Sequence, residues 1–291
     1  MQTHRRLEKL RRHWDELAAF DAVGSVLTSF QRDDVIADQR FFLQGEHEIE
    51  FILDFCTRLG AAPPLGNALD FGCGIGRVTR ALALRFDEAV GVDISSEMLR
   101  QARASQAHLS NVTLMQNGAT LSMFQDSSFD FVYSSRVLQH IPDPDQVRIY
   151  LEEFVRVLKL PGILVFQLPS SIPMKNRLQP RARLYSVLRS VGLPANLLLQ
   201  GLKLTPMRMA AVAQEEVEKT IQNTGGDLLH VRAIRRRQHA VLRQKRLWPD
   251  ELSATGRHRL TPGVALAPVA SRRSRPFGVL PPLRCGNAAN R

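Results

Sequence analysis

Apolar and polar residues repeat along the chain with two periods, one typical of strands and one typical of helices. Short apolar runs of strand length occupy residues 68–71, 89–92, 112–115, 128–135 and 163–168. Between these runs, apolar residues return every three or four positions, as Val147, Leu151 and Phe154 do after Asp143 and Pro144. Strands alternating with helices predict βαβ units, so we expect a doubly wound α/β domain. Its sheet should be mostly parallel, with helices on both faces.

The first 66 residues predict helices that precede this domain. Two apolar sets each lie on one face at helical spacing: Leu7, Leu10, Trp14 and Leu17; and Ile49, Ile52, Leu53 and Cys56. We interpret residues 1–66 as an N-terminal helical cap. It either covers a ligand or packs on the sheet as a pair of helices, and the sequence leaves both open.

A turn with three alternating glycines follows the first predicted strand, in the segment Asp70-Phe71-Gly72-Cys73-Gly74-Ile75-Gly76-Arg77. Glycines allow the positive φ angles and the close backbone approach that a ligand-binding turn needs. A dinucleotide site would require G-x-G-x-x-G, and here the third glycine comes one residue early. The carboxylate of Asp70 would also repel a pyrophosphate but attract a cation. These features favour a positively charged ligand that contains adenosine, such as S-adenosylmethionine.

The pattern D-x-G-x-G-x-G resembles motif I of the class I S-adenosylmethionine-dependent methyltransferases, particularly the small-molecule methyltransferases with a Rossmann-like domain. The resemblance covers about Asn67 to Val231. It implies transfer of a methyl group from S-adenosylmethionine to O, N or C of a small acceptor. It also implies that the turn residues hold the methionine part of the cofactor: Asp70, Gly72, Cys73, Gly74 and Gly76.

The second predicted strand ends in an acid, Asp93, which is followed by Ile94 and by Ser95, a candidate helix N-cap. A carboxylate at this place can accept hydrogen bonds from both ribose hydroxyls, because its two oxygens match a vicinal diol. We therefore expect Asp93 to bind the ribose, with Ile94 beside it.

The third strand is followed by Asn117 and Gly118. In the family this place usually carries an acid that accepts from the adenine amino group, and an amide oxygen can accept the same bond. Asn-Gly is also an ordinary turn pair, so the sequence leaves a cofactor contact and a plain turn open.

The fourth strand and the loop after it bring polar residues to a strand carboxyl end, where ligands bind in open α/β sheets. We expect Ser134 to contact the cofactor, and Arg136 and Gln139 to contact the acceptor. His140 is a candidate general base, because histidine titrates near neutral pH, and packing at a helix start is the alternative. Arg156-Val157-Leu158-Lys159-Leu160-Pro161-Gly162 also resembles a family signature, with leucine where proline usually stands.

The segment 170–213 is predicted to be an insertion after the fifth strand, and it contains no Asp or Glu. In the family such insertions commonly form the wall of the acceptor site. Several lysines and arginines, Arg181 and Arg183 among them, favour an anionic or amphipathic acceptor. A solvated basic helix is the alternative.

The charge of the chain is concentrated at its end. The formal net charge is +11, yet residues 232–291 hold 14 Lys and Arg against 2 Asp and Glu. The remainder is close to neutral, whereas a nucleic-acid enzyme more often carries a basic stripe on its body. We interpret residues 67–231 as the methyltransferase domain and residues 232–291 as a basic tail, either disordered or produced by a shifted reading frame.

Other features limit the functional class. No apolar run is long enough for a membrane span, and the N-terminus lacks the apolar stretch of a secretory signal. Three cysteines form no disulfide or metal pattern, so we expect a cytoplasmic protein without a bound metal. Two other functions remain open: a nucleic-acid-binding protein or RNA methyltransferase that uses the arginine-rich tail, and a non-catalytic protein that binds S-adenosylmethionine.

Overall fold

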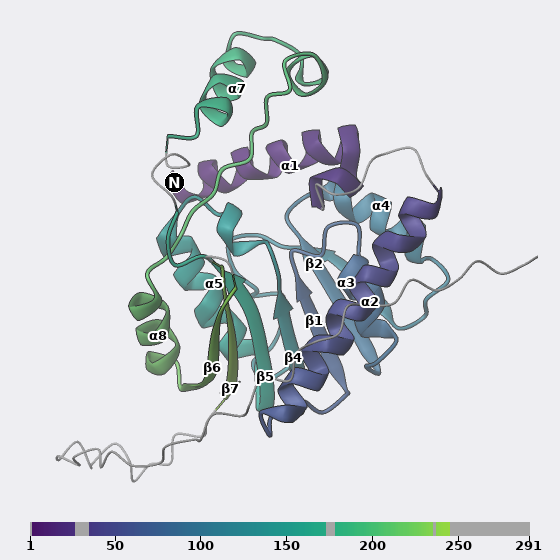
Figure 1. The fold of residues 1–291 in the computed structure, drawn as a ribbon, viewed down its shortest axis with the longest axis vertical. Coiled ribbons are helices and arrows are strands. Elements are labelled where there is room, and N and C mark those ends of the chain that lie inside the picture. The colour runs from purple at the N-terminus through teal and green to yellow at the C-terminus, as the bar shows by residue number, and fades with distance from the viewer. Residues whose placement is uncertain (1, 27–34, 173–177, 235–236, 245–291) are drawn as a thin grey trace, which may run out of the picture. The chain divides into compact units, whose positions relative to one another are not determined.

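Seven strands form one sheet in the order β3-β2-β1-β4-β5-β7-β6 (Figure 1). The computed structural model describes residues 2–26, 35–172, 178–234 and 237–244. The strands are β1 (Asn67–Phe71), β2 (Glu88–Asp93), β3 (Val112–Gln116), β4 (Phe129–Ser134), β5 (Leu158–Leu168), β6 (Gly226–Ile234) and β7 (Arg237–Gln244). Neighbouring strands from β3 to β5 pair in parallel, whereas β7 is antiparallel to both β5 and β6. The prediction of a doubly wound, mostly parallel sheet is therefore confirmed.

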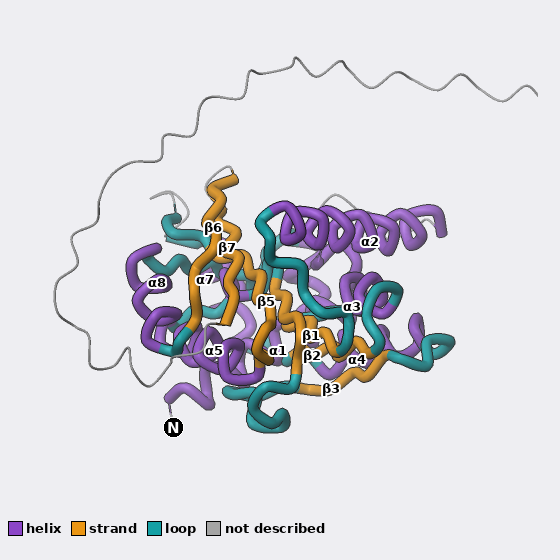
Figure 2. The backbone as a smooth tube through the Cα atoms, turned by 90° about the horizontal axis from the view of Figure 1, so that it is seen from below, coloured by secondary structure: helices purple, strands orange, loops and turns teal. Residues whose placement is uncertain are grey.

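Helices connect the strands and cover both faces of the sheet. They are α1 (Gln2–Val26), α2 (Val35–Arg58), α3 (Arg77–Ala83), α4 (Ser96–Gln106), α5 (Pro144–Val157), α7 (Pro180–Ser190) and α8 (Gln214–Asn223), with the short turns η1 (Leu138–His140) and η2 (Leu197–Gly201). Figure 2 shows α5 and α8 on one side of the strands and α2 and α3 on the other.

Two buried clusters lie on opposite faces of the sheet because side chains alternate along a strand. In β4, Val132 packs in the cluster with α5 and α8, whereas Phe131 and Tyr133 pack in the cluster with α2 and α3. Phe129 joins the same face as Val132, since the register between β4 and β5 shifts between Phe129 and Phe131. This shift keeps the large side chains of β4 buried on both faces.

Two helix starts follow the caps expected from the sequence. The Ser95 hydroxyl accepts a hydrogen bond from the backbone N–H of Met98 at 3.1 Å, which caps α4. The Asp143 carboxylate accepts from the backbone N–H of Asp145 at 3.3 Å, with Pro144 as the first residue of α5. Both caps satisfy N–H groups that have no partner within the helix.

The C-terminal boundary predicted from the sequence is wrong. Instead of ending at Val231, β6 continues to Ile234, and Arg237–Gln244 form β7 between β5 and β6. The arginines in this stretch suggested a disordered or out-of-frame tail, but backbone hydrogen bonds to two neighbouring strands do not depend on side-chain charge. The abrupt change of composition at the point where a core strand is due was the reason to suspect a shifted frame near Arg232, and β7 shows that a strand does form there. Residues 245–291 lie outside the described residues.

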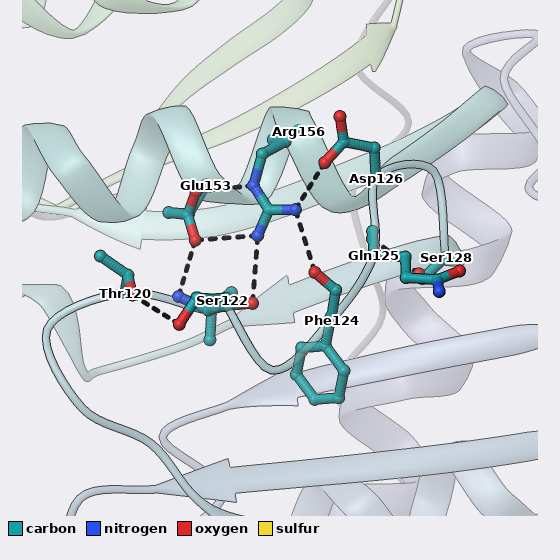
Figure 3. Close-up of polar contacts among 9 residues, drawn as sticks. Thr120, Ser122, Phe124, Gln125, Asp126, Ser128, Glu153 and Arg156 are labelled. Carbon is teal, nitrogen blue, oxygen red and sulfur yellow. Dashed lines mark hydrogen bonds and ion pairs between the residues drawn. The ribbon is translucent and has the colours of Figure 1, made fainter.

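Arg156, part of the signature at the end of α5, holds the loop between β3 and β4 (Figure 3). Its guanidinium donates to the backbone carbonyls of Leu121 and Phe124, each at 3.0 Å, and to the Asp126 carboxylate at 2.7 Å. Glu153 accepts from the same guanidinium and from the backbone N–H of Leu121, at 2.7 Å in each case. This network fixes the loop that follows Asn117.

None of the helices in the described ranges is long and apolar enough to cross a membrane.

Candidate functional site

A cavity of about 440 Å³ lies at the carboxyl ends of β1, β2 and β4. The strand order reverses beside β1, where open α/β sheets bind their ligands. Ten of the residues predicted for the site line this cavity: Asp70, Gly72, Cys73, Gly74, Asp93, Ile94, Asn117, Arg136, Gln139 and His140.

The glycine turn after β1 has the conformation that its sequence requires. Gly72, Gly74 and Gly76 have φ angles of 76°, 55° and 82°, in the left-handed region that favours glycine. A Cβ at Gly72 would lie 2.2 Å from a methyl group of Val137, so a side chain there would clash. The turn is also bonded to β2, because the N–H groups of Gly72 and Cys73 donate to the carbonyl of Val92 at 2.7 and 3.0 Å.

Asp93 joins the end of β2 to the glycine turn. One carboxylate oxygen accepts from the N–H of Gly74 and the other from the N–H of Ser95, both at 2.8 Å. Burial raises the pKa of Asp93 to about 6, against the lowering effect of these two bonds. Each oxygen keeps a second lone pair for a ligand in the cavity.

Asp70 is a buried acid whose carboxylate accepts from the Thr79 hydroxyl at 2.7 Å. Burial raises its pKa to about 7, although the Thr79 bond and the charge of Arg77 act in the opposite direction. Because desolvation disfavours the charged form, a cation in the cavity would bind to Asp70 and restore its ionisation.

Asn117 directly follows β3, and its backbone N–H donates to the Asp93 carbonyl at 3.1 Å. Its side-chain amide donates to the carbonyl of Gly118 at 3.2 Å, while the Tyr150 hydroxyl donates to the same carbonyl at 2.6 Å. Since the amide nitrogen has this partner, the amide oxygen is the group that can accept from a ligand.

A cluster around Glu48 connects α2 to the cavity. The Glu48 carboxylate accepts from Arg77 at 2.9 Å, from Arg136 at 2.7 Å and from the Tyr133 hydroxyl at 2.7 Å. Arg136 has a φ of 64°, an uncommon conformation for a residue with a side chain. The ion pair with Glu48 holds Arg136 at the cavity wall in this conformation. Burial raises the pKa of Glu48, but the charges of Arg77 and Arg136 and the bond from Tyr133 outweigh burial and lower this pKa overall.

His140 has a tautomer defined by its neighbours. Its Nδ1 lies 2.9 Å from the carbonyl oxygen of Arg208, which can only accept, so Nδ1 carries the proton. In the neutral ring Nε2 is then the acceptor, and the amide nitrogen of Gln139 lies 3.1 Å away. Nε2 of His140 therefore accepts from the Gln139 amide at the cavity wall, and a ligand proton can reach this nitrogen only in place of that bond.

Five of the predicted site residues do not line the cavity: Gly76, Gly118, Ser134, Arg181 and Arg183. Gly76 is the N-cap of α3 in a left-handed conformation, and its carbonyl accepts from the Gln106 side chain at 3.0 Å. Ser134 is fully buried and donates to the carbonyl of Phe71 at 3.2 Å, which joins β4 to β1. Arg181 and Arg183 are exposed on α7.

Sequence reasoning missed most of the wall opposite the strands. Leu7, Leu10 and Trp14 of α1 line the cavity with Met207 and Met209, which follow η2. Hydrogen bonds join this second segment to η1, since Ala210 donates its N–H to the carbonyl of Gln139 at 2.6 Å. The shared apolar face of α1 was visible in the sequence, but the contact of that face with residues about 200 positions away was not.

Comparison with known proteins places this architecture in a family. Residues 69–166 match the family model of the methyltransferase domain. This part of the chain matches a methyltransferase domain, and its sheet is Rossmann-like.

Curated relatives match the methyltransferase domain. Phosphoethanolamine N-methyltransferase 2 of Caenorhabditis elegans is 39% identical over 103 residues, which are 34% of this chain and 24% of that protein. Demethylmenaquinone methyltransferase of Staphylococcus aureus (strain JH9) is 38% identical over 110 residues, which are 37% of this chain and 44% of that protein. The chain thus spans less than half the length of these relatives.

A solved structure supports the fold. The magnesium protoporphyrin IX methyltransferase of Synechocystis PCC 6803, with bound SAH, aligns with a TM-score of 0.53 at 16% identity. The alignment covers 82% of this chain and 100% of that one. At this identity the likeness concerns the fold alone.

Proposed function

We propose that the protein transfers a methyl group from S-adenosylmethionine to O, N or C of a small-molecule acceptor. The observation that carries the proposal is the bond between Gly74 and Asp93, which joins the glycine turn to the acid at the end of β2. Together with Asp70, it places two buried carboxylates and a narrow backbone turn around one cavity.

The donor would lie along the carboxyl ends of the strands. Asp93 would accept from the ribose hydroxyls through its remaining lone pairs, and the Asn117 amide oxygen from the adenine amino group. Asp70 would bind the ammonium of the methionine part, because a desolvated carboxylate gains most from a nearby cation. S-adenosylmethionine would supply a methyl carbon activated by its sulfonium, and S-adenosylhomocysteine would be the leaving group.

Catalysis by this chain would rest mainly on positioning. Methyl transfer is a displacement at one carbon, so aligning the acceptor atom with the methyl group supplies much of the acceleration. For a hydroxyl or amine acceptor, Nε2 of His140 would take the proton that the acceptor loses, once the Gln139 amide had released that nitrogen. Once an acceptor is known, His140→Asn should lower kcat by roughly 10–100-fold for such an acceptor and leave donor affinity unchanged.

Calorimetry with S-adenosylmethionine tests the donor site directly. Asp93→Ala should weaken donor binding by about 100-fold, because it removes the ribose acceptors and releases the N–H of Gly74. Asp87→Ala, at an exposed acid just before β2, is the matched control and should bind normally. Equal affinity in wild type and Asp93→Ala would contradict the assignment, provided that circular dichroism shows both folded.

The acceptor would enter between α1 and residues 207–209, where Leu10, Trp14 and Met207 form an apolar wall. We propose an amphipathic or anionic acceptor. A screen of small acceptors with radiolabelled methyl donor would identify it, and labelling only of cationic acceptors would contradict the proposal.

The other functions have less support. The RNA-directed alternative depends on the arginine-rich tail, most of which lies outside the described residues, and the named relatives act on small molecules. A non-catalytic binder would also show a thermal shift with S-adenosylhomocysteine but no labelled product in the screen. The free thiols of Cys56 and Cys73 support the proposal of a reducing, cytoplasmic location.

A further inference from the structure

A second cavity of about 410 Å³ adjoins the first between α1 and residues 206–208. Four residues line both cavities: Leu10, Trp14, His140 and Met207. A ligand can therefore extend from the second cavity along Leu10, Trp14 and Met207 to the ring of His140.

Among the described residues, those that line the second cavity include cations and no acid. Arg6, Lys9 and Arg208 lie on its wall together with His13 and apolar side chains. Arg6 is neutralised by an ion pair with Asp143 at 2.7 Å. For Lys9 and Arg208, no ion pair with a described residue is present.

The neighbouring acids are already bound elsewhere. The Glu16 carboxylate, one turn beyond His13 on α1, accepts from Arg189 and from the Tyr185 hydroxyl at 2.6 Å. It therefore does not neutralise Lys9 or Arg208. An uncompensated pair of cations beside an apolar wall attracts anions.

The pKa of His13 reflects the positive charge around this cavity. Its pKa falls to about 4, first because the ring is buried, then because Lys9, Arg208 and Arg12 repel a proton more strongly than Glu16 attracts it. The histidine is thus neutral at physiological pH and contributes an uncharged ring to the wall. Its edge-on contact with Tyr185, at 6.0 Å between ring centroids, orients it.

We propose that this second cavity binds the anionic end group of an amphipathic acceptor, a phosphate or a carboxylate, between Lys9 and Arg208. The apolar body of the acceptor then lies against Leu10, Trp14 and Met207, and the methylated atom reaches His140. That the ligand is a methyl acceptor rests on the proposed function. Binding of the anion in this cavity does not itself require methyl transfer.

Trp14 gives a binding signal that is independent of catalysis. The chain has 2 tryptophans, so Trp248→Phe leaves Trp14 as the single reporter on the wall of both cavities. The probes are octyl phosphate, inorganic phosphate and the neutral octyl glucoside, each titrated with and without S-adenosylhomocysteine. The test variant is Lys9→Gln/Arg208→Gln. The control is Arg85→Gln/Lys219→Gln, which removes the same charge from exposed positions outside both cavities.

Octyl phosphate should bind more tightly than octyl glucoside, and the test variant should weaken its binding by about 10-fold while the control does not. Its affinity should also fall with salt. Equal weakening in both variants, or equal affinity for the phosphate and the glucoside, would overturn the proposal. If inorganic phosphate binds as tightly as octyl phosphate, the site holds free phosphate and the acceptor assignment is wrong. If octyl phosphate behaves as expected but S-adenosylhomocysteine fails to bind, the proposed function fails and the anion site stands.

Discussion

The proposed donor side and the proposed acceptor side of the cavity are built in opposite ways. Asp70, Gly74 and Asp93 lie within 24 consecutive residues, and a direct hydrogen bond joins Asp93 at the end of β2 to Gly74 in the turn after β1. The acceptor side is assembled from α1 and residues 206–209, segments separated by nearly the whole domain. A site within one βαβ unit leaves a readable pattern of spacings, whereas a wall formed by two distant segments leaves only separate apolar faces.

The two sides also differ in polarity and charge. Acids and glycine backbone form the donor side, and apolar side chains with cations form the acceptor side. Asp15 connects them, because its carboxylate accepts from the Ser95 hydroxyl at 2.7 Å and from the N–H of Glu97 at 3.2 Å. The first helix is thereby bonded to the start of α4.

The largest effect is expected in the donor turn. A Cβ at Gly76 would lie 1.6 Å from the side-chain nitrogen of Gln106, and the residue has a φ of 82°. Gly76→Ala should therefore destabilise the protein by about 2–4 kcal/mol, through backbone strain and lost hydrogen bonds of Gln106. Urea unfolding measures this. Gly118→Ala, where a Cβ would meet no atom within 4 Å, is the matched control and should unfold like wild type.

A pH profile of stability sharpens the contrast in charge. The pKa of Asp70 is about 7 in the folded protein and 3.8 in an unperturbed aspartate, so between pH 4 and 7 the native carboxyl keeps a proton that the unfolded chain releases. Stability should therefore fall as pH rises through this window and level off above pH 7. Each unit by which folding raises the pKa lowers the free energy of unfolding at high pH by about 1.4 kcal/mol. Asp93, whose pKa is raised to about 6, contributes a fall of the same sign below pH 6. Asp70→Asn should therefore reduce the slope most clearly between pH 6 and 7, and an unchanged slope there would contradict the raised pKa of Asp70.

The hydrogen bonds of Asp15, which connect the two sides, should contribute less to stability than the glycine turn. Asp15→Ala removes the acceptor for Ser95 and Glu97, and should lower the free energy of unfolding by about 1 kcal/mol. Donor affinity should change little, because Asp93 and the glycine turn keep their bonds. Glu8→Ala, which breaks only the ion pair with Arg11 on the surface of α1, is the control. A large loss of donor affinity in Asp15→Ala would show that the two sides are not independent.

The smallest effect is expected on α7. Arg181 and Arg183 are exposed and line neither cavity, so Arg181→Gln/Arg183→Gln should leave octyl phosphate binding within about twofold of wild type. The original expectation from the sequence was a role in binding the acceptor. A tenfold loss of octyl phosphate affinity in this variant would show that α7 contributes to the acceptor site.

Helix and strand positions were largely predictable because they depend on local periodicity and caps. Ser95 and Asp143 cap their helices as expected, and the strand before Asp93 lies where its apolar run placed it. The strand β7 was missed because its arginines resemble a disordered tail. Its place in the sheet is set by backbone pairing with β5 and β6. The roles of Gly76 and Ser134 could not be predicted either, because their hydrogen-bond partners, Gln106 and Phe71, lie in other elements.

By itself the sequence determined the α/β class, the glycine turn and the acid at the end of β2, because each depends on residues close together in the chain. Only the tertiary structure decided which cations face the cavity. A charge pattern shows how many lysines and arginines a segment has, but burial and ion pairs decide which remain uncompensated: Arg6 is paired with Asp143, whereas Lys9 and Arg208 face the second cavity. The tautomer of His140 was likewise fixed by the carbonyl of Arg208, which the fold brings to its ring from 68 residues away.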